Sequence, residues 1–326
     1  MSETSTGQEE PVTYTVHGNL RGLRLDQVIS QVLPAISTRE ARQMIMAGNV
    51  LSCGVIVRRN YRVREGDSFT VPSPPRHAVA ASTAPLPPLS IVYEDDELLV
   101  VDKPANVVVH PSHRNPDGTL YDAILAYAAS LPHGALAYRP SLVQRLDKNT
   151  SGLLLVAKIP GARRQLQRQL ARHSIEKGYL ALVHGSPVGD SGTVDLPLGH
   201  DPLDRRRMTV RHDGQASVTS WRVVERLPCT TLLRVSPRTG RTHQIRAHML
   251  AIGLPIVGDP VYGADVQSIT LQRQFLHASA LSFDHPVHRE RLFFESPLPP
   301  DLAQVLARLR ANDGGSVHLT TGDRKR

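Results

Sequence analysis

Residues 144–158 read QRLDKNTSGLLLVAK, a run of polar turn residues that leads directly into an uninterrupted apolar segment. Asp, Asn, Ser and Gly favour turns, and a short apolar run that follows a turn is typical of a buried strand. The junction places Asp147 at the start of that strand, where the fold can hold a side chain in one position. The stretch therefore predicts a central buried strand with a candidate catalytic carboxylate at its N-terminal end.

Three interpretations of Asp147 follow from the residues alone. In the first, its carboxylate caps a local Asx-type turn. In the second, Asp147, Asn149, Ser151 and Gly152 are calcium ligands, but Lys158 stands where a calcium loop requires Glu, and the residues between are apolar. In the third, Asp147 is catalytic. The pattern excludes the calcium loop and leaves the other two open.

Around this stretch, residues 91–310 mix strand and helix patterns without a repeating βαβ order, which favours an α+β fold. Residues 160–173 predict an amphipathic helix, with Arg164, Arg168 and Arg172 on one face and leucines on another. That basic face is either solvated or in contact with an RNA backbone.

The first part of the chain predicts a separate small domain. We expect residues 1–20 to be a disordered acidic start and residues 21–71 a small α/β unit. In that unit Ser37 and Glu40 form a capping box, and Gly48 ends the helix that follows. Residues 72–90 form a Pro/Ala linker, and residues 311–326 a disordered tail.

Composition narrows the class of protein. The chain has 326 residues, a formal charge of +8 and a pI near 9.8, and almost all of its cations are Arg. This charge indicates either a polyanionic partner or simply a charged, soluble surface, and composition alone leaves both open. Two distant cysteines, Cys53 and Cys229, indicate a reducing compartment. Because neither a signal peptide nor a membrane-spanning run is evident, we expect a cytoplasmic protein, most simply a monomer, without membrane contact.

At this point the sequence resembles a known family, the RluA-type pseudouridine synthases. Residues 145–158 are similar to the family's catalytic signature, and further segments agree in order and spacing. These segments are DDELLVVDKP (95–104), EKGYLALV (176–183), GTVDLPLGHDPLDRRRMTV (192–210), RTGRTHQIRAHMLAIGLPIVGDPVYG (238–263) and HASALSF (277–283). Gln144, Asn106 and His200 depart from the usual family residues, and none is at a position to which a chemical role is assigned.

Residues 21–71 resemble the small RNA-binding domain known from a ribosomal small-subunit protein, an S-four-like domain. The resemblance includes AGNVLSCGVIVRRNYRVREGDSFTV (47–71), where Cys53 stands in place of the usual Asn. It implies RNA contact by basic residues of this domain. In this domain we expect RNA-binding side chains at Arg39, Arg42, Arg58 and Arg59. We expect two more in the predicted helix 160–173, at Arg164 and Arg168.

The resemblance implies a catalytic domain with a mixed, mostly antiparallel sheet. The implied activity is that of an isomerase that converts uridine to pseudouridine in structured RNA by base flipping, with neither cofactor nor metal. We expect large-subunit ribosomal RNA as the partner, with transfer RNA as the alternative. Asp147 is then the catalytic carboxylate and Arg246 its ion-pair partner. Arg145 fills the gap that the target leaves in the RNA stack, and Tyr179 stacks on the extruded base.

Other histidines in the later blocks, His243 and His248, are interpreted as structural or hydrogen-bonding, because no metal-ligand spacing surrounds them. Two rival classes remain at this level: a non-catalytic RNA-binding protein that keeps the fold, and a hydrolase of nucleosides or RNA. Release of free uracil or cleaved strands would distinguish the second.

Overall fold

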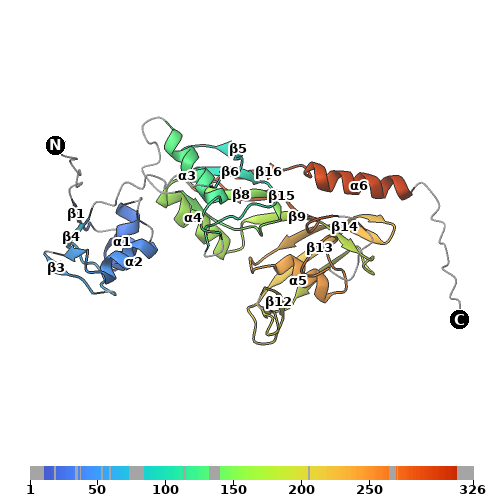
Figure 1. The fold of residues 1–326 in the computed structure, drawn as a ribbon, viewed down its shortest axis with the longest axis horizontal. Coiled ribbons are helices and arrows are strands. Elements are labelled where there is room, and N and C mark those ends of the chain that lie inside the picture. Colours follow the sequence, from blue (N-terminus) through green and yellow to red (C-terminus); the bar gives the residue numbers. More distant parts are fainter. Residues whose placement is uncertain are drawn as a thin grey trace, which may run out of the picture. The chain divides into compact units, whose positions relative to one another are not determined.

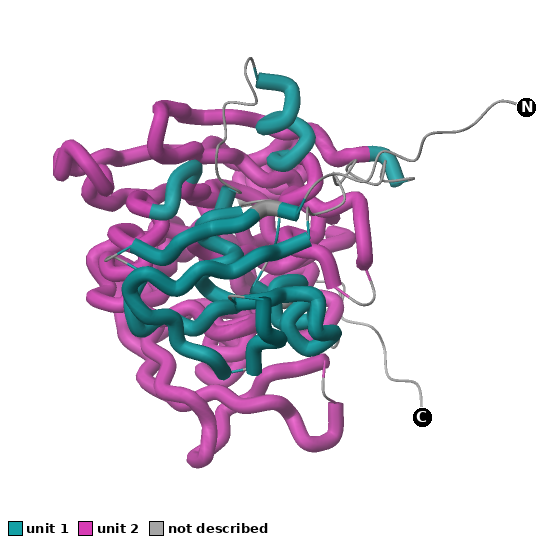
Figure 2. The backbone as a smooth tube through the Cα atoms, turned by 90° about the vertical axis from the view of Figure 1, so that its left-hand side faces the viewer, with its two compact units in different colours: residues 1–85, 124–141, 158–160 teal, residues 86–123, 142–157, 161–326 magenta. Residues whose placement is uncertain are grey.

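A computed structural model describes residues 11–17, 20–33, 36, 38–52, 54–58, 60–72, 84–112, 115–131, 140–204, 206–263, 269 and 271–313 (Figure 1). The chain forms two compact units (Figure 2). The first contains residues 1–85, 124–141 and 158–160, and the second contains the remainder. The first unit thus includes two later stretches that the sequence-based division at residues 72–90 assigned to the second domain.

The first unit combines two helices with a small antiparallel sheet. The helices are α1 (Leu25–Val32) and α2 (Thr38–Met46), and the strands are β1 (Val12–Thr15), β2 (Leu51–Ser52), β3 (Val55–Ile56) and β4 (Ser68–Val71). The sheet order is β1-β4-β2-β3. Apolar residues at helical spacing, Leu25, Val28 and Ile29 in α1 and Ala41 and Ile45 in α2, are buried in one core with Phe69 of β4.

Two details of this unit test the sequence analysis. Gly48 has a positive φ of 75° two residues after the last residue of α2, so it ends the helix as predicted. The expectation of a disordered start is wrong for residues 12–15, because β1 pairs in register with β4 from Val12↔Val71 to Thr15↔Ser68. Ser37, the predicted N-cap, and Cys53 lie outside the described residues.

The second unit is built on a ten-stranded sheet whose main path is β10-β13-β14-β9-β15-β8-β6-β5, with β16 and β7 paired to β15 and β8. The pairings of this sheet for which a register is described are antiparallel, except that of β15 with β8, so the mixed, mostly antiparallel sheet was predicted correctly. The strands are β5 (Ser90–Glu94), β6 (Leu98–Lys103), β7 (Ser141–Leu142), β8 (Ser151–Ala157), β9 (Glu176–His184), β10 (Ser191–Asp195), β13 (Val218–Leu227), β14 (Thr230–Pro237), β15 (Leu276–Asp284) and β16 (Arg291–Glu295).

Strand β8, the continuation of the opening stretch, is buried along its whole length between β6 and β15. It approaches β15 closely at Gly152, which has φ 114° and pairs with Ala278. A Cβ atom at position 152 would collide with the backbone of Ala278. Glycine is required here because both the backbone angle and the close approach exclude a side chain.

The remaining elements are the hairpin β11 (Leu198–His200) and β12 (Met208–Val210), and the helices α3 (Leu120–Ser130), α4 (Pro160–Ala171), α5 (Gln244–Ala251) and α6 (Pro300–Asp313). The predicted amphipathic helix is α4, which buries Ala162 and Leu166. Helix α6 extends three residues into the expected tail, and residues 314–326 lie outside the description. None of the helices in the described ranges combines the length and hydropathy of a bilayer-spanning helix.

Candidate active site

The loop that carries Asp147 is held from several sides. Thr150 N–H donates to the backbone carbonyl of Asp147 at 3.1 Å, which closes the turn without the aspartate side chain. Buried Lys103, at the end of β6, donates to the carbonyl of Lys148 at 3.0 Å. Arg273, which precedes β15, donates to the carbonyl of Asn149 at 3.0 Å. The Asp147 carboxylate is therefore not needed to cap the turn and is free to point elsewhere.

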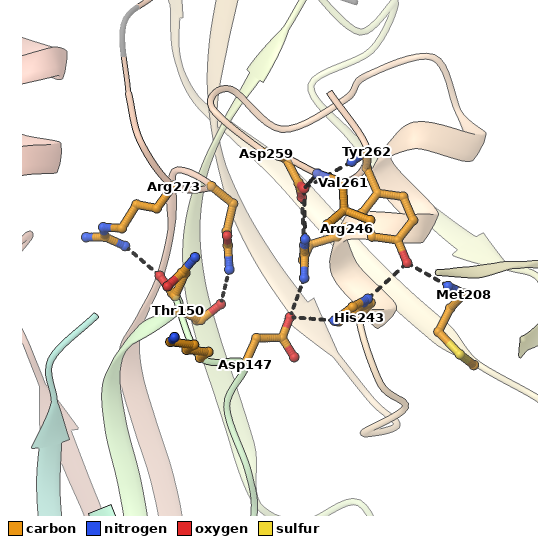
Figure 3. A network of polar contacts seen from close by, with 12 residues as sticks. Asp147, Thr150, Met208, His243, Arg246, Asp259, Val261, Tyr262 and Arg273 are labelled. Atoms are coloured by element: carbon orange, nitrogen blue, oxygen red, sulfur yellow. Dashed lines mark hydrogen bonds and ion pairs between the residues drawn. The ribbon is translucent and has the colours of Figure 1, made fainter. Parts of the chain in front are cut away.

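That carboxylate points to the first turn of α5 (Figure 3). Arg246 Nη1 donates to Asp147 Oδ2 at 3.1 Å, so the predicted ion pair is present. The remaining donors of Arg246 bind Asp259: Nε to Oδ2 at 2.6 Å and Nη2 to Oδ1 at 2.8 Å. The side chains of Asp259 and Arg246 are 0% and 5% exposed, whereas that of Asp147 is 21% exposed. One buried guanidinium thus joins a fully buried carboxylate to a partly open one.

A second branch of the network reaches Asp147 through His243 and Tyr262. Met208 N–H donates to the Tyr262 hydroxyl at 2.7 Å, and His243 Nδ1 lies 3.1 Å from the same oxygen. His243 Nε2 lies 3.9 Å from Asp147 Oδ2. The Tyr262 ring also faces the guanidinium of Arg246, with 5.0 Å from its Cζ to the ring centroid.

Asp147, His243 and Arg246 line a cavity of about 480 Å³, a size within the range of small-ligand sites. Of the described residues that line it, Asp147 is the only carboxylate, and the cationic ones come from several elements. The charged and aromatic lining residues are His110, Arg145, Asp147, His173, Lys177, Tyr179, Arg238, Arg241, His243 and Arg246. The cavity is therefore strongly cationic, with one acid at its wall.

Burial and charge set the protonation states. Burial disfavours the charged form of Arg246, but the hydrogen bonds and charge of Asp259, together with Asp147, raise its pKa above the usual value. Burial, and then the Asp147 charge, raise the pKa of Tyr179. Burial lowers the pKa of His243, while Asp147 acts in the opposite direction. At neutral pH the site therefore holds a guanidinium, a neutral phenol and a neutral imidazole beside Asp147.

The structure brings four predicted residues together. Asp147 and Arg246 form the ion pair, Tyr179 of β9 is buried in the cavity wall, and Arg145 lines the cavity while remaining exposed. Their chemical roles remain predictions. His248, interpreted as hydrogen-bonding, is buried and contacts Thr219 Oγ1 and the carbonyl of Leu196.

The predicted RNA-binding arginines are more varied. Arg58, Arg164 and Arg168 are exposed. Arg42 is only partly free, because its Nε and Nη2 donate to the buried carboxylate of Asp26, which joins α2 to α1. Arg59 and the side chain of Arg39 lie outside the described residues.

Sequence reasoning gave no role to Asp259, Tyr262 or Lys103, although all three lie in the segments that were quoted. The available signal was GDPVYG at 258–263, in which an acid and an aromatic residue flank a turn. In the structure that turn is organised by Asp259 Oδ1, which accepts the backbone N–H groups of Val261 and Tyr262.

Away from this cavity, Glu97, His285 and His288 lie close enough together to suggest a metal centre. The hydrogen bonds of His285 argue against that use. Its Nδ1 accepts the backbone N–H groups of Val287 and His288, so its proton is on Nε2, which faces Asp95 at 3.0 Å. A metal ion would have to displace this proton, so we assign the cluster a structural role.

Comparison with known proteins gives consistent matches. Residues 97–251 match the family described as RNA pseudouridylate synthase, and residues 23–69 match the S4 domain. An uncharacterized RNA pseudouridine synthase of Bacillus subtilis is 41% identical over 289 residues, which cover 89% of this chain and 95% of the relative.

Two further matches extend this result. Ribosomal large subunit pseudouridine synthase D of Nitrosomonas europaea is 41% identical over 321 residues, with 96% of this chain and 92% of the relative covered. Among solved structures, human RNA pseudouridylate synthase domain containing 4 is 26% identical with a TM-score of 0.56, and the match covers 68% of this chain and 93% of that one.

Proposed function

Because the chain belongs to the RNA pseudouridylate synthase family and is thus an RNA-modifying isomerase, we propose that it acts on large-subunit ribosomal RNA with Asp147 as its catalytic carboxylate. Relatives named for the ribosomal large subunit cover nine-tenths of the chain, which supports this choice of RNA. In the reaction the bond between uracil N1 and ribose C1′ breaks, and a bond between uracil C5 and C1′ forms. The C5 proton is lost and N1 gains one, so the reaction is an isomerisation.

The observation that carries the proposal is the ion pair of Asp147 with Arg246 at the cavity wall. Burial alone raises the pKa of a carboxyl group, whereas an adjacent guanidinium favours its ionised form. Arg246 contacts Oδ2 only, and within the described residues Oδ1 carries no hydrogen bond. Asp147 can therefore present one unpaired oxygen to the developing positive charge at C1′, either as nucleophile or as stabiliser.

Access to the uridine requires base flipping. A stacked base must leave its helix, which costs a few kcal/mol. Exposed Arg145 can fill the gap in the stack, and Tyr179 can provide about 1–3 kcal/mol of stacking on the extruded base. Among its described lining residues the cavity has a single carboxylate, whereas a glycoside hydrolase site uses two. Exclusion of water protects the detached sugar.

The first unit is expected to contact the same RNA as the catalytic unit. Its match to the S4 domain and its exposed Arg58 favour contact with phosphates, which do not require a particular base. The exposed arginines of α4, Arg164 and Arg168, are further candidates for backbone contact.

The test is Asp147→Asn, which keeps the shape of the side chain and removes its charge. Ribosomal RNA from a deletion strain is incubated with each protein, pseudouridine is mapped chemically, and RNA affinity is measured by fluorescence anisotropy. We expect turnover to be abolished and affinity to stay within a few-fold of wild type. Asp190→Asn, at an exposed ion pair with Arg226, is the matched control. Activity in Asp147→Asn, or release of free uracil by the wild type, would contradict the proposal.

A further inference from the structure

His243 is fixed in one tautomer by Tyr262. The Tyr262 oxygen accepts the backbone N–H of Met208, so its hydroxyl proton needs another acceptor. The nearest one described is His243 Nδ1 at 3.1 Å. If Nδ1 carried a proton instead, the hydroxyl of Tyr262, which is 5% exposed, would be left unpaired at a cost of about 1–3 kcal/mol. Nδ1 is therefore the acceptor, and the imidazole proton is on Nε2.

The backbone of His243 is held in an uncommon conformation. It has φ 53°, in the left-handed region, directly before α5. Such residues persist only where their surroundings fix them, and they occur often at functional sites. Here the next residue, buried Gln244, holds the backbone in place through its side chain. Its Nε2 donates to Val218 O and Thr219 Oγ1, and its Oε1 accepts from Thr239 Oγ1 and from the backbone N–H of Arg241.

This arrangement points Nε2 toward Asp147 (Figure 3), and both residues line the cavity. The distance from Nε2 to Asp147 Oδ2 is 3.9 Å, too long for a hydrogen bond, and Arg246 already contacts that oxygen. Within the described residues, Nε2 has no acceptor at hydrogen-bonding distance. A half-buried N–H group is thus presented to whatever occupies the cavity.

We propose that His243 is a catalytic residue that donates a hydrogen bond from Nε2 to a carbonyl oxygen of the detached uracil. This proposal rests on the proposed function. When the N1–C1′ bond breaks, its electron pair leaves with uracil, and the negative charge spreads over the carbonyl oxygens. A donor placed there before the bond breaks stabilises the charge as it develops.

The neutral state of the imidazole matters for the second half of the reaction. Uracil must remain an anion until C5 bonds to C1′, because protonation would remove the electron pair that makes C5 nucleophilic. A neutral imidazole donates a hydrogen bond without giving up its proton, whereas an imidazolium is acidic enough to transfer it. Burial, Arg246 and Arg145 favour the neutral form, and Asp147 and Asp259 oppose them; burial dominates, so the pKa of His243 lies below its usual value.

The experiment compares two substitutions that carry the same backbone strain. His243→Gln keeps a neutral N–H donor near the position of Nε2, and His243→Phe keeps the ring volume without a donor. Both are assayed for single-turnover pseudouridine formation on a ribosomal RNA fragment between pH 5 and 9, with RNA affinity measured alongside. His212→Ala, at an exposed histidine outside the cavity lining, is the control.

We expect His243→Phe to lower the rate roughly 10- to 100-fold, the loss of one hydrogen bond to a charged group, with RNA affinity within about threefold of wild type. His243→Gln should retain most of the rate. It should also lose the fall in rate that we expect of the wild type when acid protonates His243.

A wild-type rate for His243→Phe would overturn the role of His243. Equal losses of rate in His243→Phe and His243→Gln would also overturn it, as would a loss of rate that is fully accounted for by weaker RNA binding. Failure of the proposed function is distinguishable, because the wild type and His212→Ala would then form no pseudouridine on this RNA.

Discussion

Replacement of Arg246 by Lys tests whether one guanidinium must serve two carboxylates. Lys keeps the charge but lacks the planar fork of donors. Asp259 is fully buried and Asp147 is partly exposed, so the single ammonium should remain with Asp259. Asp147 then loses one charge-assisted hydrogen bond, worth about 1.5–3 kcal/mol, which corresponds to a fall of roughly 10- to 150-fold in kcat/KM.

Arg246→Met is the harsher variant and separates stability from catalysis. Removal of the cation leaves Asp259 charged and unpaired in the interior, at a cost of about 3–5 kcal/mol, or a Tm lower by roughly 6–20 °C for a unit of this size. Adding Asp259→Asn removes the unpaired charge, so the double variant should recover most of the stability. It should stay inactive, because Asp147 still lacks its guanidinium.

The assays are thermal unfolding by circular dichroism and steady-state pseudouridine formation. Arg211→Met, at the exposed ion pair with Asp213, is the matched control and should change neither quantity. If activity returned together with stability in the double variant, Arg246 would act only through folding. If Arg246→Lys had the wild-type kcat/KM, the guanidinium fork would be unnecessary. Either result would refute the reasoning.

Three further predictions follow from single residues. Gly152→Ala forces a side chain into a positive φ and against Ala278, so urea unfolding should show a loss of about 2–5 kcal/mol. Burial lowers the pKa of Lys103 to about 7 from its model-compound value of 10.5. The unfolded chain therefore binds more protons between these values, stability rises with pH across that window, and Lys103→Met should lose this rise in urea titrations. Arg58→Ser should weaken all RNA binding alike and reduce the salt slope by about 1 if Arg58 contacts a phosphate, whereas an unchanged slope would exclude that contact.

Local patterns predicted the fold well where apolar period and turn chemistry agree. Strand β8, helix α4 and the end of α2 at Gly48 are all examples. Strand β1 was missed because its alternation, Val12-Thr-Tyr-Thr-Val16, follows an acidic start and was grouped with it. Its stability comes from pairing with β4, from Val12↔Val71 to Thr15↔Ser68, and from burial of Val16. Local composition does not report such a distant partner.

In the candidate site, too, the sequence predicted what depends on neighbouring residues and missed what depends on distant ones. Asp147 stands out because polar turn residues precede a buried strand, but its partner Arg246 is 99 positions away and was assigned only through family resemblance. Asp259 was passed over because an Asp-Pro sequence is an ordinary turn signal. Lys103 was given no role, because the sequence does not show that it is buried. In the structure it is fully buried and donates three hydrogen bonds, to the carbonyls of Pro104, Val107 and Lys148.

Under the proposed function, the distant partners also explain how Arg246 can stay beside Asp147 when RNA enters the cavity. A guanidinium beside Asp147 alone would be free to leave with any RNA phosphate that entered, because phosphate competes well for arginine. Arg246 cannot leave, since two of its donors bind Asp259, which is itself held by the backbone N–H groups of Val261 and Tyr262. Under the proposed function, the exposed Arg145 is available to contact RNA, while Arg246 is held beside Asp147. We therefore infer that Asp259 keeps Arg246 paired with Asp147 and away from RNA phosphates.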